Sequence, residues 1–434
     1  QVSFVGARVV LERDAQGRAN WEFSGRSGQK SPVQSNKDGG MGVAVRDVVL
    51  EDSTLLLRDA VSGTRIQFDK MSGRVQAEML QGPFDARLAF ESAGIPVKLE
   101  LLSGDLRAAE QPMALLVETQ GGRLRFDGSA GNTQATPVLK GKLKSEGENF
   151  SALVQALAAV AGRPPAPLPP AFAQKFSLLG DVTADASALA ATGVQLNLAG
   201  ESGAGEFALR RGAIPRLDVK FAFAKLDFDQ LLTSRDAGKP LPVAGSGKPV
   251  AAAPAATAGG DQFLRQVEGS LDLAVGTIVY QGRTAQQVAV KADLSKGVLS
   301  LREFGGQFPG NTQIAAAGTI DASKTDPSGT GKIEVRSARL RDFLSWLSVD
   351  VGQVPTDRLN ALNFTGQITA TAEGNVQIAN AVAQLDSTVA KGAVTLRMAP
   401  RLGFVADLDV DSVNVDGYFP PNADKKKKKK LGVA

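Results

Sequence analysis

The sequence contains neither cysteine nor histidine among its 434 residues. Their absence excludes cysteine nucleophiles, Ser-His-Asp triads, Cys/His zinc sites and acid–base catalysis by histidine. A cysteine-free chain suits an oxidising compartment, where a stray thiol is a liability, without requiring one. Few classes of enzyme remain, and we therefore expect a non-enzymatic protein that needs no cofactor and no metal.

The body of the chain also carries almost no net charge. The formal charge of +4, from 49 Lys and Arg against 45 Asp and Glu, depends on one run of six lysines, since without them the balance is 43 − 45 = −2. A high pI that rests on one run gives no reason to expect a nucleic-acid partner. The run could contact anionic headgroups, or it could be a disordered insert beside two prolines. Its members are Lys425, Lys426, Lys427, Lys428, Lys429 and Lys430.

Long hydrophobic runs are missing too. The longest candidates, Ala152 to Ala161 and Ala251 to Ala258, fall short of the roughly 20 residues that a membrane-spanning helix needs. The chain begins at Gln1 inside a strand-like pattern. We therefore expect it to be an internal piece of a longer protein.

What the chain has in abundance is the residue usage of β-sheets. Val, Leu, Ala and Thr dominate the periodic segments, and 47 glycines provide turns. From Val2 to Leu143 the period is two, and turn residues such as those from Asp14 to Gly17 separate the runs, as in β-hairpins. The pattern predicts a mainly β fold with a long antiparallel meander and a few short helices.

Two helices and one linker interrupt the predicted strands. Asn149 is a candidate N-cap, and apolar residues recur at helical spacing from Phe150 to Val160, ahead of a Pro-rich run. A second helical segment runs from Leu340 to Leu347. The stretch from Ala237 to Gly260 has no periodicity and predicts a flexible linker.

An internal repeat is the most informative feature of the chain. The segment from Phe176 to Leu232 returns from Phe364 to Pro420, strand for strand, and such repetition is typical of a scaffold or conduit. We divide the chain into a β meander (1–148), a helix with the first β repeat (149–235), an Ala/Pro/Gly-rich linker (236–262), a β module (263–340), a helix with the second β repeat (341–420) and a Lys-rich linker (421–434).

The strands of the β module are apolar on one face only. Between residues 287 and 294, valines and a leucine alternate with polar side chains, so one face is wet and the other needs a cover. The cover is the sheet itself, another sheet, or an apolar ligand, because periodicity identifies the buried face but not what buries it. The candidate lining residues are Val288, Val290, Leu294, Leu299, Leu301 and Ile314.

Several segments together resemble the AsmA family of Gram-negative bacteria, whose members include TamB-like and YhdP-like proteins. The strand-turn-Asn-Trp pattern from Leu11 to Phe23 is similar to the start of these proteins. The helix and Pro-rich run from Asn149 to Pro170, and the endings Leu226 to Leu232 and Val415 to Pro420, also resemble that family.

The resemblance implies a periplasmic protein tethered to the inner membrane by an N-terminal helix that this chain lacks. It implies an elongated, twisted antiparallel β-sheet forming an apolar groove, which carries phospholipid acyl chains between the inner and outer membranes and so supports outer-membrane biogenesis. An outer-membrane or periplasmic protein partner is also implied. The alternative is an envelope scaffold or assembly factor that acts through protein partners without carrying lipid.

Two carboxylate patterns suggest other chemistry. Asp407, Asp409 and Asp411 share a strand face and could bind Ca²⁺, although solvated side chains explain the same spacing. Asp227 and Asp229 could form an acid pair for glycoside hydrolysis, but the second copy of the repeat does not preserve the pair.

Overall fold

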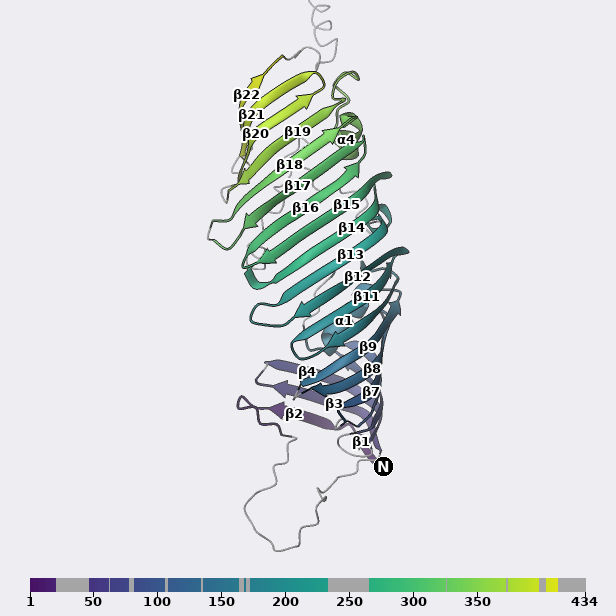
Figure 1. Cartoon of the computed structure of the whole chain (residues 1–434). Coiled ribbons are helices and arrows are strands. Elements are labelled where there is room, and N and C mark those ends of the chain that lie inside the picture. The colour runs from purple at the N-terminus through teal and green to yellow at the C-terminus, as the bar shows by residue number, and fades with distance from the viewer. Residues whose placement is uncertain are drawn as a thin grey trace, which may run out of the picture. The chain divides into compact units, whose positions relative to one another are not determined.

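The structure, a computed structural model, divides the chain into two compact units, unit 1 (Gln1–Gly200) and unit 2 (Glu201–Ala434). Each unit contains eleven of the described strands, and Figure 1 shows how the strands within each unit lie side by side. The prediction of a mainly β fold with a few short helices is confirmed. The residues described are 1–20, 47–61, 63–77, 82–105, 108–133, 136–163, 168, 172–232, 265–324, 326–371, 374–397 and 403–412.

Unit 1 is a sheet in which the strands from β3 onward pair antiparallel with their neighbours in sequence order. Short turns fix this order; Ala93 and Gly94, for example, both adopt positive φ and close a two-residue hairpin turn. The strands are β1 (Val2–Val5), β2 (Arg8–Arg13), β3 (Val48–Asp59), β4 (Thr64–Ala77), β5 (Phe84–Ser92), β6 (Ile95–Ser103), β7 (Glu110–Thr119), β8 (Arg123–Thr133), β9 (Thr136–Gly147), β10 (Phe176–Ala184) and β11 (Ala188–Leu198).

The first two strands correct the expectation of a purely antiparallel meander. Both β1 and β2 pair in parallel with β3, one after the other along the same edge. At the break between them, Ala7 N donates to Ser53 Oγ over 3.2 Å. Parallel neighbours need a long connection, and alternation alone does not distinguish parallel from antiparallel pairing.

The helix α1 (Phe150–Val160) lies between β9 and β10, as the sequence predicts. Asn149 caps it, because its side-chain oxygen accepts a hydrogen bond of 2.9 Å from Ala152 N. The helical spacing buries Leu153, Ala156 and Ala159 on one side. The predicted N-cap and helix are therefore confirmed.

Unit 2 is a sheet whose strands follow one another in sequence order, with one parallel pair, β13 with β14, among otherwise antiparallel pairs. The helix α2 (Phe228–Leu232) follows β13, and α4 (Leu340–Trp346) joins β18 to β19, near the second predicted helix. The strands are β12 (Glu201–Arg210), β13 (Arg216–Asp227), β14 (Glu268–Tyr280), β15 (Arg283–Ser295), β16 (Val298–Phe308), β17 (Thr312–Asp321), β18 (Ser328–Ser337), β19 (Leu362–Ala370), β20 (Asn375–Leu385), β21 (Thr388–Arg397) and β22 (Gly403–Val410).

Corresponding strands of the two repeat copies share an irregularity. The pairing of β10 with β11 shifts its register beside Gly180, and the pairing of β19 with β20 shifts beside Gly366. In the partner strands, Gly193 and Asn380 adopt left-handed conformations with φ of 57° and 50°. A β-bulge of this kind adds one residue to one strand and bends it, so the repeated sequence carries a repeated local geometry.

Candidate functional site: the apolar face of unit 2

In unit 2, strand register places apolar residues opposite apolar residues from β12 to β22. Two adjacent rows cross all eleven strands without a polar residue. We call this surface the apolar face. The outer row consists of Leu209, Leu217, Gly269, Leu294, Leu299, Ile320, Gly329, Ala370, Val376, Leu396 and Phe404, and the second row of Phe207, Val219, Leu271, Ala292, Leu301, Gly318, Gly331, Ile368, Ile378, Val394 and Ala406.

Bulges keep the apolar face continuous where strict alternation would break it. In β16, both Leu301 and Phe304 lie on the apolar face although they are three residues apart, because the register shifts between them. The two intervening charged residues remain on the opposite face, where Arg302 pairs with Asp293 at 2.5 Å and Glu303 with Lys291 at 2.7 Å. A one-residue slip moves a strand's side chains to the other face, so these bulges preserve the apolar rows.

The opposite face of unit 2 is polar and faces water. Beyond the pairs in β15 and β16, Arg216 pairs with Asp218 at 2.8 Å, and Asp218 also accepts from Ser270 Oγ over 2.7 Å. Burial raises the pKa of Asp218, but the bonds from Arg216 and Ser270 outweigh it and hold the pKa below its ordinary value. Ion pairs of this exposed kind contribute little stability and mark a solvated surface.

One margin of the apolar face, which we call the helix margin, is covered by α4 and its neighbours. Trp346 donates from Nε1 to the carbonyl oxygen of Tyr280 over 3.0 Å and packs against Phe308 and Phe343 with ring centroids 5.7 and 6.0 Å away. These aromatic rings join α4 to the ends of β14 and β16. At the neighbouring ends of β17 and β18, the buried hydroxyl of Thr312 bonds with Ser337 Oγ over 2.8 Å.

The rest of the apolar face stays open in the part of the chain that the structure describes. Along the other margin, the open margin, Leu217 is 42% exposed and Ile320 is 48% exposed, and Leu271 in the second row is 37% exposed. The extensive contacts of these strands are with their hydrogen-bonded neighbours, with α2 added on β14. Among the described residues, the apolar face is therefore a sheet surface without a second layer of protein over most of its extent.

In unit 1, by contrast, a helix covers the apolar face of the sheet. A core of Met71, Phe90, Val97 and Val117 lies beneath Leu157 and Val160 of α1, among other side chains. The rings of Phe68 and Phe90 lie 4.6 Å apart. Ser92 Oγ donates to the carbonyl oxygen of Ala159 over 2.9 Å, which fastens α1 to β5. Here the protein supplies its own cover.

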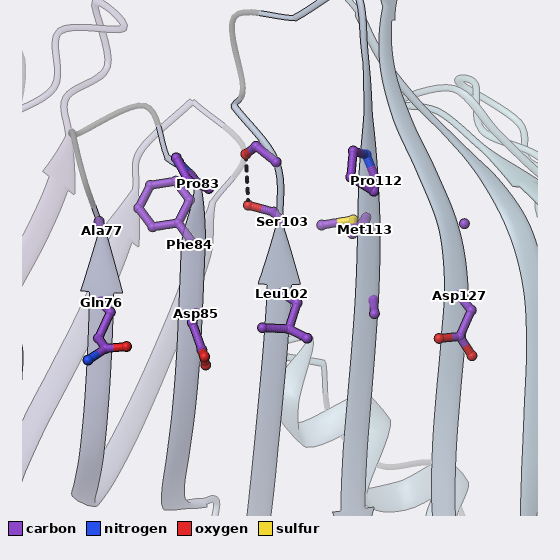
Figure 2. Close-up of a pocket in the computed structure, with 13 residues that line it drawn as sticks. Gln76, Ala77, Pro83, Phe84, Asp85, Leu102, Ser103, Pro112, Met113 and Asp127 are labelled. Carbon is purple, nitrogen blue, oxygen red and sulfur yellow. Dashed lines mark hydrogen bonds between the residues drawn. The ribbon is translucent and has the colours of Figure 1, made fainter.

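A hollow of about 1120 Å³ lies in unit 1 at the ends of β4 to β8 (Figure 2). Its lining includes Gln76, Asp85, Leu102 and Asp127, each from a different strand. Both carboxylates are already paired, Asp85 with Arg87 at 3.4 Å and Asp127 with Arg125 at 2.6 Å. Among the described residues, no group of three or more carboxylates could hold a metal ion.

The structure places all six candidate lining residues on the apolar face. Val288, Val290 and Leu294 lie in β15, Leu299 and Leu301 in β16, and Ile314 in β17. Val288 is buried and the others are half-buried. The run from Lys425 to Lys430 lies outside the described residues. Whether the six contact lipid stays a prediction.

The carboxylates that suggested other chemistry have structural roles or face solvent. Asp227 accepts from Gln230 N and from Lys225 Nζ, each over 3.1 Å, and Asp229 accepts from the backbone N–H groups of Gln281 and Gly282. Asp407 and Asp409 are exposed on β22. Every carboxyl pKa that is perturbed within the described ranges is lowered, whereas a general acid needs a raised one.

Sequence reasoning missed the aromatic cover and the bulges. The cover joins Tyr280 and Phe308 to Trp346, which lie far apart in the chain, and the only signal was the helical segment near Leu340. In the Gly-rich stretch at residues 305–310, β16 ends at Phe308, the chain turns at Gly310 with φ of 79°, and a register shift in β15 lies opposite Gly306. There Gly306 lets β15 approach closely, since a Cβ would lie 3.0 Å from a methyl of Val288.

No family model, no curated protein and no solved structure matches this chain. The long, open and mostly antiparallel sheet is compatible with AsmA-like proteins but is not specific to them. No described helix has the length and apolarity to cross a bilayer.

Proposed function

We propose that this protein binds phospholipid acyl chains along the apolar face of unit 2 and carries them between the inner and outer membranes of a Gram-negative envelope. The observation that carries the proposal is the pair of apolar rows that cross eleven strands and that the described residues leave open over most of their extent. An exposed apolar surface of this size marks an interaction site. The family resemblance supplies the periplasmic setting, the inner-membrane tether and the role in outer-membrane biogenesis.

The apolar face has suitable dimensions for an acyl chain that lies along the strands. From Val288 near the helix margin to Leu294 in the outer row is six residues, about 20 Å at the rise of a β-strand. The hydrocarbon core of a bilayer is about 30 Å thick, so each leaflet holds chains about 15 Å deep. One acyl chain therefore fits between the two margins.

The energetics favour such binding without a catalytic step. Each methylene group kept out of water contributes on the order of 0.8 kcal/mol. Transfer along the rows exchanges one apolar contact for another at each strand, so the protein needs shape and apolarity rather than a nucleotide or a metal. The protein itself is non-enzymatic in this proposal.

Trp346 provides a direct test, because it lies at the helix margin and is one of only two tryptophans. In a Trp21→Phe background, titration with fatty acids brominated at the middle or the end of the chain should quench Trp346 fluorescence saturably. Val290→Asp should weaken the quenching at least tenfold, because it places a charge on the apolar face. The matched control Ala289→Asp, one residue away on the opposite face, should leave it unchanged.

If the folded protein showed no saturable quenching of Trp346 with either brominated fatty acid, acyl-chain binding would be contradicted. Equal loss in both aspartate variants would also count against it, since only one of them alters the apolar face. An envelope scaffold that works through protein partners would then be the better account.

A further inference from the structure

The aromatic cover closes one end of the apolar face of unit 2. It consists of Tyr280, Phe308, Phe343 and Trp346. Phe308 joins the cover to the apolar face, since its ring centroid lies 5.7 Å from that of Trp346 and 6.4 Å from that of Phe304. An acyl chain that lies along the strands toward the helix margin therefore meets these rings.

Burial changes from one margin to the other along single strands. In β17, Thr312 at the helix margin is 0% exposed, whereas Ile320 at the open margin is 48% exposed. In β15, Ala285 at the helix margin is 1% exposed, whereas Leu294 in the outer row is half-buried. In the part of the chain that the structure describes, water therefore reaches the open margin far more readily than the helix margin.

Polar atoms at the helix margin bond within the protein. Trp346 Nε1 donates to the carbonyl oxygen of Tyr280 over 3.0 Å. The hydroxyl of Thr312 is bonded to Ser337 Oγ over 2.8 Å and to the carbonyl oxygen of Pro309 over 2.9 Å. A carboxylate or phosphate placed there would lose its water against aromatic rings and groups that are already paired, which is costly. The methyl end of an acyl chain has no such cost.

The distance from the aromatic cover to the open margin sets a chain length. The ring of Phe308 lies beside Val288, because a Cβ on Gly306 would lie 3.0 Å from a methyl of Val288 and 3.3 Å from that ring. From Val288 to Leu294 in the outer row the strand advances about 20 Å. An extended chain advances about 1.2 Å per bond, as a polypeptide does, so this span takes about sixteen carbons.

We propose that an acyl chain binds unit 2 with its methyl end against Phe308 and its carboxyl end at the open margin, and that the aromatic cover sets the longest chain that is fully buried. The inference rests on the proposed function, because it states how the apolar face orients and selects the same acyl chains. Each methylene group that stays on the face raises the affinity about fourfold, and carbons beyond the open margin add little.

Bromine position tests the orientation without a substitution at the site. In the Trp21→Phe background, a fatty acid brominated at its end should quench Trp346 more strongly than one brominated in the middle, because the methyl end lies nearest the aromatic cover. Equal quenching by the two fatty acids, or stronger quenching by the mid-chain bromine, would overturn the proposed orientation.

The length limit is tested by letting saturated fatty acids compete with the brominated probe. The affinity should rise about fourfold with each methylene group up to about sixteen carbons and then level off. Phe308→Ala removes the ring that lies 5.7 Å from Trp346 and should move the limit by about four carbons, to about twenty.

The matched control is Phe404→Ala, which removes the same ring from the outer row of β22, where Phe404 is 76% exposed. This control should leave the limit at about sixteen carbons. A wild-type affinity that keeps rising beyond that length, or an equal shift of the limit in both variants, would overturn the role of the aromatic cover. Circular dichroism would confirm that each variant keeps its strands, and the wild-type measurements decide the question if Phe308→Ala does not fold.

The two proposals fail in distinguishable ways. If no brominated fatty acid quenches Trp346 saturably, acyl-chain binding itself is wrong. If quenching is saturable but depends on neither bromine position nor chain length, acyl-chain binding stands and the closed end at the aromatic cover is wrong.

Discussion

Units 1 and 2 use the same strand pattern but cover it differently. Val97 in β6 and Leu271 in β14 both alternate with charged residues, yet Val97 is 2% exposed and Leu271 is 37% exposed. In unit 1, side chains of α1 lie over a compact core, whereas the helices and aromatic rings described in unit 2 cover one margin of the apolar face. The comparison teaches that alternation creates an apolar face, and that the connections between strands decide how much of this face the protein itself covers.

The largest expected effect comes from placing one aspartate on the apolar face of each unit and comparing the loss of stability. Val117→Asp places a carboxylate in the core of unit 1, where the valine is 4% exposed, and should lower the free energy of unfolding by more than about 3 kcal/mol. Leu271→Asp should cost less than about 1 kcal/mol, because water reaches its position. Urea denaturation followed by circular dichroism measures both. Equal costs would mean that the face of unit 2 is also sealed.

A smaller effect should follow from displacing α1 from its position over the core of unit 1. A Cβ on Gly121 would lie 2.3 Å from the backbone nitrogen of Leu153, so Gly121→Ala must displace the helix. We expect a loss of about 2 kcal/mol and new binding of an apolar dye to unit 1. The control is Gly329→Ala in unit 2, where the nearest atoms are at least 3.4 Å from the added Cβ and little should change. Normal dye binding by the Gly121 variant would show that α1 is not what covers the core.

The sequence predicts the local elements of both units well. The N-cap at Asn149 and the helix from Phe150 to Val160 follow from capping chemistry and apolar spacing. Likewise, the alternation from Val288 to Leu294 places these residues on one face, which the register of β15 confirms. These features depend on neighbours along the chain, which a sequence displays.

Long-range features are where sequence reasoning stops. The strands β13 and β14 pair in parallel, but their apolar and polar residues alternate as they would in an antiparallel pair. The residue pattern therefore does not predict the parallel pairing. The bulge at Arg302 and Glu303 depends on which face each charge can occupy once its partner strands are in place. The open face of unit 2 is an absence of covering elements in the described residues, and periodicity carries no information about what lies above a strand.

The smallest expected effect concerns acid stability in unit 2. Burial raises the pKa of Asp227, but hydrogen bonds from Gln230 N–H and Lys225 outweigh it, and the pKa lies below the ordinary 3.8. Because the folded pKa is depressed, this carboxylate stabilises the fold above about pH 4 and loses that contribution as the pH falls through the folded value. Asp227→Asn should therefore make the urea midpoint, followed by Trp346 fluorescence, fall less between pH 5 and pH 3. An identical fall of the urea midpoint in both proteins would show that Asp227 does not contribute to the acid sensitivity of unit 2.

The most direct test of the open apolar face is its lipid content. The chain would be purified from a Gram-negative envelope, and organic extracts would be measured by mass spectrometry beside the Val290→Asp and Ala289→Asp variants. The account predicts roughly one or more phospholipids per chain in the wild-type and Ala289→Asp proteins, and at least tenfold less in Val290→Asp. A folded wild-type protein that carries no more phospholipid than Val290→Asp would contradict it.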